Sequence, residues 1–191
     1  RKTTPVKTVY LDTSVILSPY HRGDSYRAES SSILASRGLT KAISHIGLIE
    51  LAATVSRLRA RKEIKLPDEV ESILSSLDFN KQVYSLVLFM LKHGNVRVQV
   101  PDTIINLHLE DIEVSLSSMF VEAFNLAPRT LLKSLDNLHV ASLLSLSKEG
   151  QVIHYIVTGD EELLKARKKI VELTNIPVTS PRELVSLESV K

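Results

Sequence analysis

The chain has 191 residues, of which 43% are hydrophobic and 24% are charged, and it contains no cysteine. These proportions are typical of a compact globular protein and exclude wholesale disorder, a disulfide framework and thiolate chemistry. The formal net charge of +2 is too small for the whole surface to attract a polyanion, so any nucleic-acid footprint must come from local basic clusters.

The first part of the chain predicts alternating strands and helices. Residues 7–11 form an apolar run, which is typical of a strand buried on both faces of a parallel sheet. A helix is expected over residues 25–36, and a short second strand over residues 42–44. From Ile46 onward, apolar residues recur at three- and four-residue spacing, which predicts another helix.

The middle of the chain predicts more helix around one strand. Pro67 opens a pair of helices, and we expect this helical hairpin over residues 67–92 to be an insertion. Residues 96–100 alternate apolar and polar side chains as a strand does. A further helix is expected to start at Pro101 and to run to about Met119.

The last part of the chain predicts the same alternation. Pro128 is expected to break the chain before a helix over residues 129–148. A strand over 152–158, a helix over 160–173 and a short strand over 177–179 follow. This pattern predicts a three-layer α/β/α fold with a central parallel sheet of about four to five strands. We expect residues 1–191 to form a single domain.

Asp12 ends the first apolar strand, and two hydroxyl residues, Thr13 and Ser14, follow it. Open α/β sheets bind their ligands at the carboxyl ends of their strands, which makes this acid the first candidate for chemistry. Because Asp, Thr and Ser also cap helices, the alternative is that Asp12 merely begins a helix.

Glu50 lies among apolar residues in the helix predicted from Ile46, where an ionised carboxylate is costly unless it is paired or bound to a metal. The alternative is a solvent-facing position, which is usual for one helical glutamate. Arg57 and Arg61 follow on nearly the same helix face, so this face carries one acid and then a basic ridge. The two arginines are therefore candidate nucleic-acid contacts.

Two further acids lie near the end of the chain. Asp136 is in a predicted helix, and His139 follows it by three residues; such a pair is commonly found at surfaces, so we do not count the histidine as a ligand. Asp160 follows a predicted strand, although Thr158 and Glu161 also have the spacing of a capping box.

These four acids are expected to meet. Asp12 and Asp160 follow predicted core strands, whereas Glu50 and Asp136 lie in flanking helices. Four carboxylates within contact distance cannot all ionise without a compensating cation. Oxygen ligands without cysteine favour Mg²⁺ or Mn²⁺ over zinc.

Four short segments in this order resemble the PIN-domain family of metal-dependent, VapC-like ribonucleases. They are residues 11–14, 44–51, 136–141 and 156–163. The resemblance implies a PIN-like fold and hydrolysis of RNA phosphodiester bonds with Mg²⁺ or Mn²⁺. The implied catalytic and metal-binding residues are Asp12, Glu50, Asp136 and Asp160, with Ser14 and Thr158 supporting the site by hydrogen bonds.

The resemblance also implies partners. RNA would be the substrate. The protein would be the toxin of a toxin–antitoxin pair, neutralised by an antitoxin protein. It would also form a homodimer. No apolar stretch is long enough for a membrane span and no signal-like segment is apparent, so a cytoplasmic location is expected. The alternative is a catalytically inactive PIN-like protein that binds RNA or acts as a scaffold.

Overall fold

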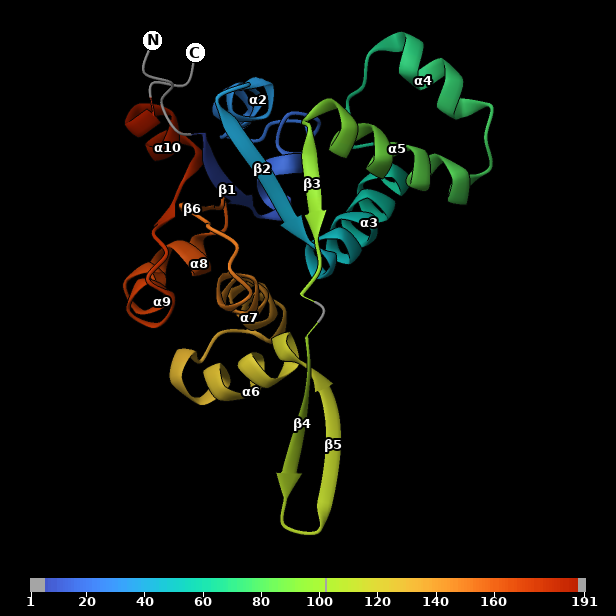
Figure 1. Cartoon of the computed structure of the whole chain (residues 1–191). Helices are drawn as coiled ribbons and strands as arrows, with labels where there is room; N and C mark the ends of the chain where they lie inside the picture. The colour runs from blue at the N-terminus through green and yellow to red at the C-terminus, as the bar shows by residue number, and fades with distance from the viewer. Residues whose placement is uncertain (1–5, 102, 189–191) are drawn as a thin grey trace.

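A computed structural model describes residues 6–101 and 103–188 and shows a parallel sheet with helices on both faces (Figure 1). The five strands of this sheet lie in the order β3-β2-β1-β6-β7. They are β1 (Lys7–Leu11), β2 (Leu39–Ser44), β3 (Val96–Gln99), β6 (Tyr155–Val157) and β7 (Val178–Thr179). The predicted three-layer α/β/α fold with a central parallel sheet is confirmed.

The helices follow the strands in the alternation that the sequence predicts. They are α1 (Thr13–Leu17), α2 (Arg27–Ala35), α3 (His45–Ala60), α4 (Asp68–Ser75), α5 (Phe79–His93), α6 (Ser118–Thr130), α7 (Ser134–Lys148), α8 (Glu161–Lys165), α9 (Arg167–Thr174) and α10 (Pro181–Glu188). Within the described ranges, none of them has the length and apolar character that a membrane crossing requires.

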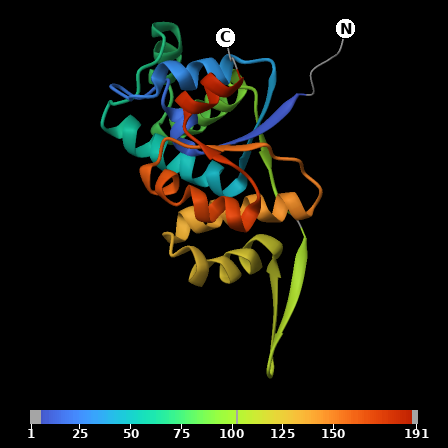
Figure 2. The ribbon, with the colours of Figure 1, turned by 90° about the vertical axis from the view of Figure 1, so that its left-hand side faces the viewer.

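The two faces of the sheet carry two separate hydrophobic clusters. Side chains alternate across a strand, so Val9 and Leu11 of β1 point into a cluster with α2, α3 and α5. Tyr10 points into the other cluster, which α6, α7 and α9 cover. Both views show α6 beyond α7, farther from the sheet on this side (Figures 1 and 2).

The helical pair predicted after Pro67 is present as α4 and α5. Pro67 occupies the N-cap position of α4, and Asp78 caps α5 by accepting a hydrogen bond from the Lys81 amide at 3.0 Å. The two helices are confirmed, whereas their status as an insertion over residues 67–92 stays a prediction.

The helix predicted from Pro101 to Met119 is wrong. The chain forms a two-stranded antiparallel hairpin there, with strands β4 (Ile104–Leu109) and β5 (Ile112–Ser117). Alternate residues of both strands are apolar, and this period of two prevails over the start signal of the proline. Glu110 turns the chain between them with a left-handed φ of 53°.

Two further boundaries differ from the prediction. Pro128 lies inside α6, which continues to Thr130 and ends at Leu131 with a left-handed φ of 56°. The helix predicted over residues 160–173 is instead two short helices, α8 and α9, which meet at Ala166.

Candidate metal centre

The candidate centre lies at the carboxyl edge of the sheet, where β1 and β6 end side by side. The two strands pair in parallel, with Leu11 opposite Val157. The residues that follow the two strands, Asp12 after β1 and Thr158 after β6, therefore lie next to each other. Ligand sites of open α/β folds lie at this edge.

Asp12 is buried, with 7% of its surface exposed, and its carboxylate is held by two hydroxyls. Its Oδ2 accepts hydrogen bonds from Ser14 Oγ at 2.6 Å and from Thr158 Oγ1 at 2.8 Å. Asp12 does occupy the N-cap position of α1, but its side chain makes no capping hydrogen bond. Helix capping therefore does not account for this acid.

The same two hydroxyls also fix the turn that follows β6. The Gly159 amide donates to Ser14 Oγ at 2.9 Å, and the Asp160 amide donates to Thr158 Oγ1 at 2.9 Å. Each hydroxyl thus donates to the Asp12 carboxylate and accepts from a backbone N–H. This arrangement ties the ends of two strands to one carboxylate.

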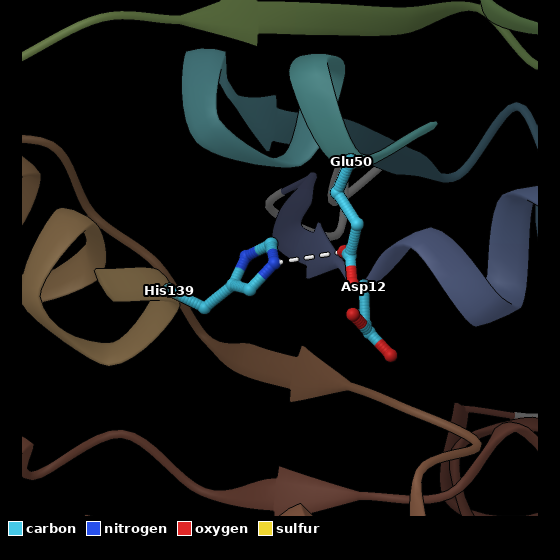
Figure 3. Close-up of side chains that lie close together, drawn as sticks. All are labelled: Asp12, Glu50 and His139. Atoms are coloured by element: carbon cyan, nitrogen blue, oxygen red, sulfur yellow. Dashed lines mark hydrogen bonds and ion pairs between the residues drawn. The ribbon is translucent and has the colours of Figure 1, made fainter. Parts of the chain in front are cut away.

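Glu50 reaches the same place from α3, and Figure 3 shows it beside Asp12. Its Oε2 accepts a hydrogen bond from Thr13 Oγ1 at 2.5 Å and lies 3.0 Å from His139 Nε2. Burial alone would raise the pKa of Glu50, but the hydrogen bonds from His139 and Thr13 hold it below its ordinary value. Glu50 is therefore ionised at neutral pH.

His139 comes from α7 and is 3% exposed. Its Nδ1 lies 2.8 Å from the Tyr10 hydroxyl, which lies 2.8 Å from Ser44 Oγ, and the Gly47 amide donates to Ser44 Oγ. One arrangement of protons satisfies every group: Ser44 donates to Tyr10, and Tyr10 donates to Nδ1. The neutral histidine then carries its proton on Nε2 and donates it to Glu50.

Asp12, Glu50 and His139 each offer a ligand atom, and these atoms all lie within 4.8 Å of one another. This cluster could hold a metal ion. Because Tyr10 and Glu50 engage both ring nitrogens of His139, the ion would bind the carboxylates, and the histidine would orient Glu50. The sequence offered one signal for the histidine, its position one helical turn after Asp136, but spacing alone does not show where the ring points.

The other two predicted acids lie around this cluster rather than in it. Asp136, in the first turn of α7, is partly buried, and burial together with the negative charges of Asp160 and Asp12 raises its pKa. Asp160 is exposed, and its Oδ1 accepts hydrogen bonds from the amides of Glu162 and Leu163. Asp160 itself therefore caps α8, in place of the capping box between Thr158 and Glu161 that was the alternative to a metal-binding role.

The arrangement fits a divalent cation. Four carboxylates gather here, and after burial the charges of Asp160 and Asp12 are the main causes of the raised pKa of Asp136. The Oδ1 of Asp12 and the Oε1 of Glu50 accept no hydrogen bond from the residues that the structure describes. Each carboxylate thus has one oxygen held by donors and one available to a ligand.

Arg57 and Arg61 lie further along α3, and both are exposed. The positive charge of Arg57 contributes to the lowered pKa of Glu50, which places the arginine within electrostatic reach of the cluster. Its guanidinium donates to Thr54 Oγ1 at 2.9 Å. Arg61 is the C-cap residue of the helix.

Comparisons with known proteins are informative at the level of structure. No protein-family profile matches the sequence, and neither does any curated protein. Among solved structures, the chain is similar to one in the crystal structure of VapBC2 from Rickettsia felis bound to a DNA fragment from their promoter. The TM-score is 0.51 at 14% sequence identity, over 91% of this chain and 98% of that one. The likeness is one of fold and is consistent with a PIN-like architecture.

Proposed function

We propose that this protein is a metal-dependent ribonuclease of the PIN type, which hydrolyses RNA phosphodiester bonds. The observation that carries the proposal is the cluster of Asp12, Glu50 and His139 at the carboxyl edge of the sheet, with Asp136 beside it. The fold likeness to VapBC2 supports the same class of activity.

The roles of the residues are inferred from their positions and charges. Asp12 and Asp136 would hold Mg²⁺ or Mn²⁺, with Asp160 at the outer edge of the site. A divalent ion held there supplies Lewis acidity, lowering the pKa of water and neutralising the charge that develops on the phosphate. Thr13 and His139 fix one oxygen of Glu50, which leaves the other to orient the attacking water and accept its proton.

The products distinguish this mechanism from its main alternative. Attack by water leaves a 5′-phosphate and a 3′-hydroxyl, whereas attack by the neighbouring ribose hydroxyl leaves a 2′,3′-cyclic phosphate. Mass spectrometry of the cleaved RNA should find the former ends. Cyclic phosphate ends would contradict the proposed use of water.

The test of the proposal is RNA cleavage during titration with Mg²⁺ or Mn²⁺, comparing the protein with Asp12→Asn. We expect cleavage to require the metal and to fall about a hundredfold or more in the variant, because a buried ligand is lost. Asp68→Asn, which changes an exposed acid on α4, is the matched control and should cleave normally. Cleavage that persists in a chelator or in Asp12→Asn would rule the proposal out.

The likeness to VapBC2 further supports a role as the toxin of a toxin–antitoxin pair, with an antitoxin protein as partner. Expression in bacteria tests this role. Growth should stop when the protein is produced and continue when Asp12→Asn is produced at the same level.

A further inference from the structure

The hairpin of β4 and β5, here called the arm (residues 104–117), extends away from the body of the molecule in both views (Figures 1 and 2). It begins beside the first residue of α6, because the Ser118 amide donates to the Thr103 carbonyl at 2.7 Å. Apart from this base, the arm has no layer of the fold against it.

The two faces of the arm differ in chemistry. On one face, Ser115 donates to Asn106 at 2.7 Å, and His108 lies 3.9 Å from Glu113. The other face pairs apolar residues across the strands. These pairs are Ile105 with Leu116 and Leu107 with Val114, and Ile112 lies on the same face nearer the tip.

The apolar face has no partner within the described part of the chain. Ile105, Leu107, Val114 and Leu116 are half-buried and belong to neither hydrophobic cluster, and Ile112 near the tip is 62% exposed. An isolated two-stranded hairpin is at best marginally stable in water, and packing against another element is what stabilises one. A contiguous apolar face that the rest of the described chain leaves partly in solvent marks an interaction site.

A second apolar strip lies on α6. Phe120, Phe124 and Leu131 are 46%, 75% and 83% exposed. Phe120, Phe124 and the exposed Ala127 follow one another at spacings of four and three residues, so they share one side of the helix, and Leu131 comes directly after its end. The buried residues of α6, such as Met119 and Leu126, lie on a different side and pack against α7.

Charges on the two surfaces are complementary. The arm ends in three acidic residues, Glu110, Asp111 and Glu113, all of them exposed. Beyond the C-terminal end of the α6 strip lies an exposed basic residue, Lys133. An arm that lies along the strip with its tip at this end pairs opposite charges.

The same charges disfavour two other partners for the apolar face of the arm, which are a second arm and a nucleic acid. Two arms packed side by side in parallel would bring their acidic tips together. Packed antiparallel, each tip would meet Glu149, which accepts hydrogen bonds from Thr103 and Ser118 at the base of the arm. An acidic tip also repels the phosphates of a nucleic acid.

We propose that the arm is a dimerisation element, and that its apolar face packs on the Phe120–Phe124 strip of α6 in a second copy of this chain. A two-fold axis makes the contact reciprocal, so that each copy gives one arm and receives one. The interface buries both apolar surfaces and pairs each acidic tip with Lys133.

The first experiment measures the oligomeric state of the full chain by sedimentation velocity at micromolar concentrations. We expect a dimer, and we expect Leu107→Lys with Val114→Glu to weaken it about tenfold or more. These two positions face each other across the strands, so the introduced charges attract and keep the hairpin paired. The control is His108→Lys, which alters the polar face opposite Glu113 and should leave the dimer intact.

A variant of the α6 strip tests the same interface without changing the arm, which the double substitution could misfold. Phe124→Ser changes a side chain that is 75% exposed, so it should leave the fold unchanged by circular dichroism and weaken the dimer as the arm variant does. A monomeric wild-type protein would overturn the proposal, as would a dimer that withstands both changes. If RNA protects the arm of a monomeric wild-type protein from hydrogen exchange, the occupant is RNA and the proposal is wrong.

The second experiment tests which surfaces meet. The chain has no cysteine, so a single introduced cysteine is its only thiol. A flexible bismaleimide should cross-link a mixture of Leu107→Cys and Phe124→Cys, and it should leave Leu107→Cys alone uncoupled. Coupling of Leu107→Cys to itself without coupling in the mixture would show that arms pack against arms, contrary to the proposal.

Discussion

The ionised form of Asp136 is destabilised by its surroundings in the candidate centre. Its pKa is raised by burial and by the negative charges of Asp160 and Asp12, so its ionised form is less stable in the folded protein than in the unfolded chain. Functional sites commonly contain ionisable groups that are destabilised in this way, and binding of a ligand of opposite charge removes the destabilisation. Without a cation, the protein should therefore become more stable when this charge is removed.

We predict that Asp136→Asn raises the melting temperature of the metal-free protein. A domain of this size gains about 2–4 °C for each kcal/mol of repulsion that is removed. Because the folded-state pKa is raised, the stability that protonated Asp136 supplies is present at low pH and is lost as the pH rises through that pKa. The gain in the variant should thus be large near neutral pH and vanish below 3.8, the ordinary value.

The same variant should respond less to metal. Mg²⁺ or Mn²⁺ is expected to raise the melting temperature of the wild-type protein and to do so by a smaller amount in Asp136→Asn. Differential scanning calorimetry with and without the metal measures both effects. A variant that melts below the wild-type protein near neutral pH would show that this carboxylate does not suffer the repulsion described.

Part of the candidate site could be foreseen from the sequence. Asp12 and Thr158 follow strands, and residues after neighbouring parallel strands meet at one edge, so their contact follows from the fold. The role of His139 could not be foreseen, because its direction depends on how α7 crosses the sheet and on the Tyr10 hydroxyl that receives Nδ1. Helical spacing carries neither piece of information.

Among the helices, α3 joins the acidic cluster to a basic surface. Glu50 lies near its beginning, Arg57 two turns further on, and Arg61 at its end. A helix advances 1.5 Å per residue, so these charges form a ridge along which an RNA backbone would run away from the site.

We predict that Arg57→Gln with Arg61→Gln weakens RNA binding and flattens its dependence on salt. Each lost phosphate contact should reduce the slope of log affinity against log salt concentration by about 1. Arg37→Gln is the single-charge control, because Arg37 precedes β2 at the opposite, amino edge of the sheet. Fluorescence anisotropy with a labelled RNA across a salt series gives the slopes, and an unchanged slope in the double variant removes both arginines from the footprint.

The arm shows why one element was predicted wrongly. A proline at a helix start is a strong local signal, and it outweighed the alternation of Ile105, Leu107 and the residues that follow. The helix-start preference of a single proline is weak evidence when apolar and polar side chains alternate with a period of two over the next dozen residues. The helices that were predicted well, such as α3 and α5, are those in which local signals and periodicity agree.

For the molecule as a whole, the alternation of strands and helices was enough to predict the architecture. Parallel strands require crossover helices, and few topologies satisfy that rule in a chain of this length. The arm lay beyond such reasoning, because it packs on neither hydrophobic cluster and no rule of the sheet requires it.

We predict that the arm can be removed without loss of the fold. Thr103 and Ser118 are hydrogen-bonded neighbours, so a short glycine link can replace residues 104–117. The shortened protein should keep its far-UV circular dichroism and its metal-dependent cleavage per chain, and it should sediment as a monomer. Loss of the folded state would show that the arm contributes to the stability of the body.

Because β6 pairs with β1, the candidate centre can form only after β6 has been synthesised. Asp12 and Thr158 are separated by 146 residues, so ribosomes working at about 5–20 residues per second add the second roughly 7–30 s after the first. Until then the nascent chain has no Thr158 to hold the acid and no β6 to flank it. The cleavage that we propose therefore cannot begin before residue 158 has been added to the chain.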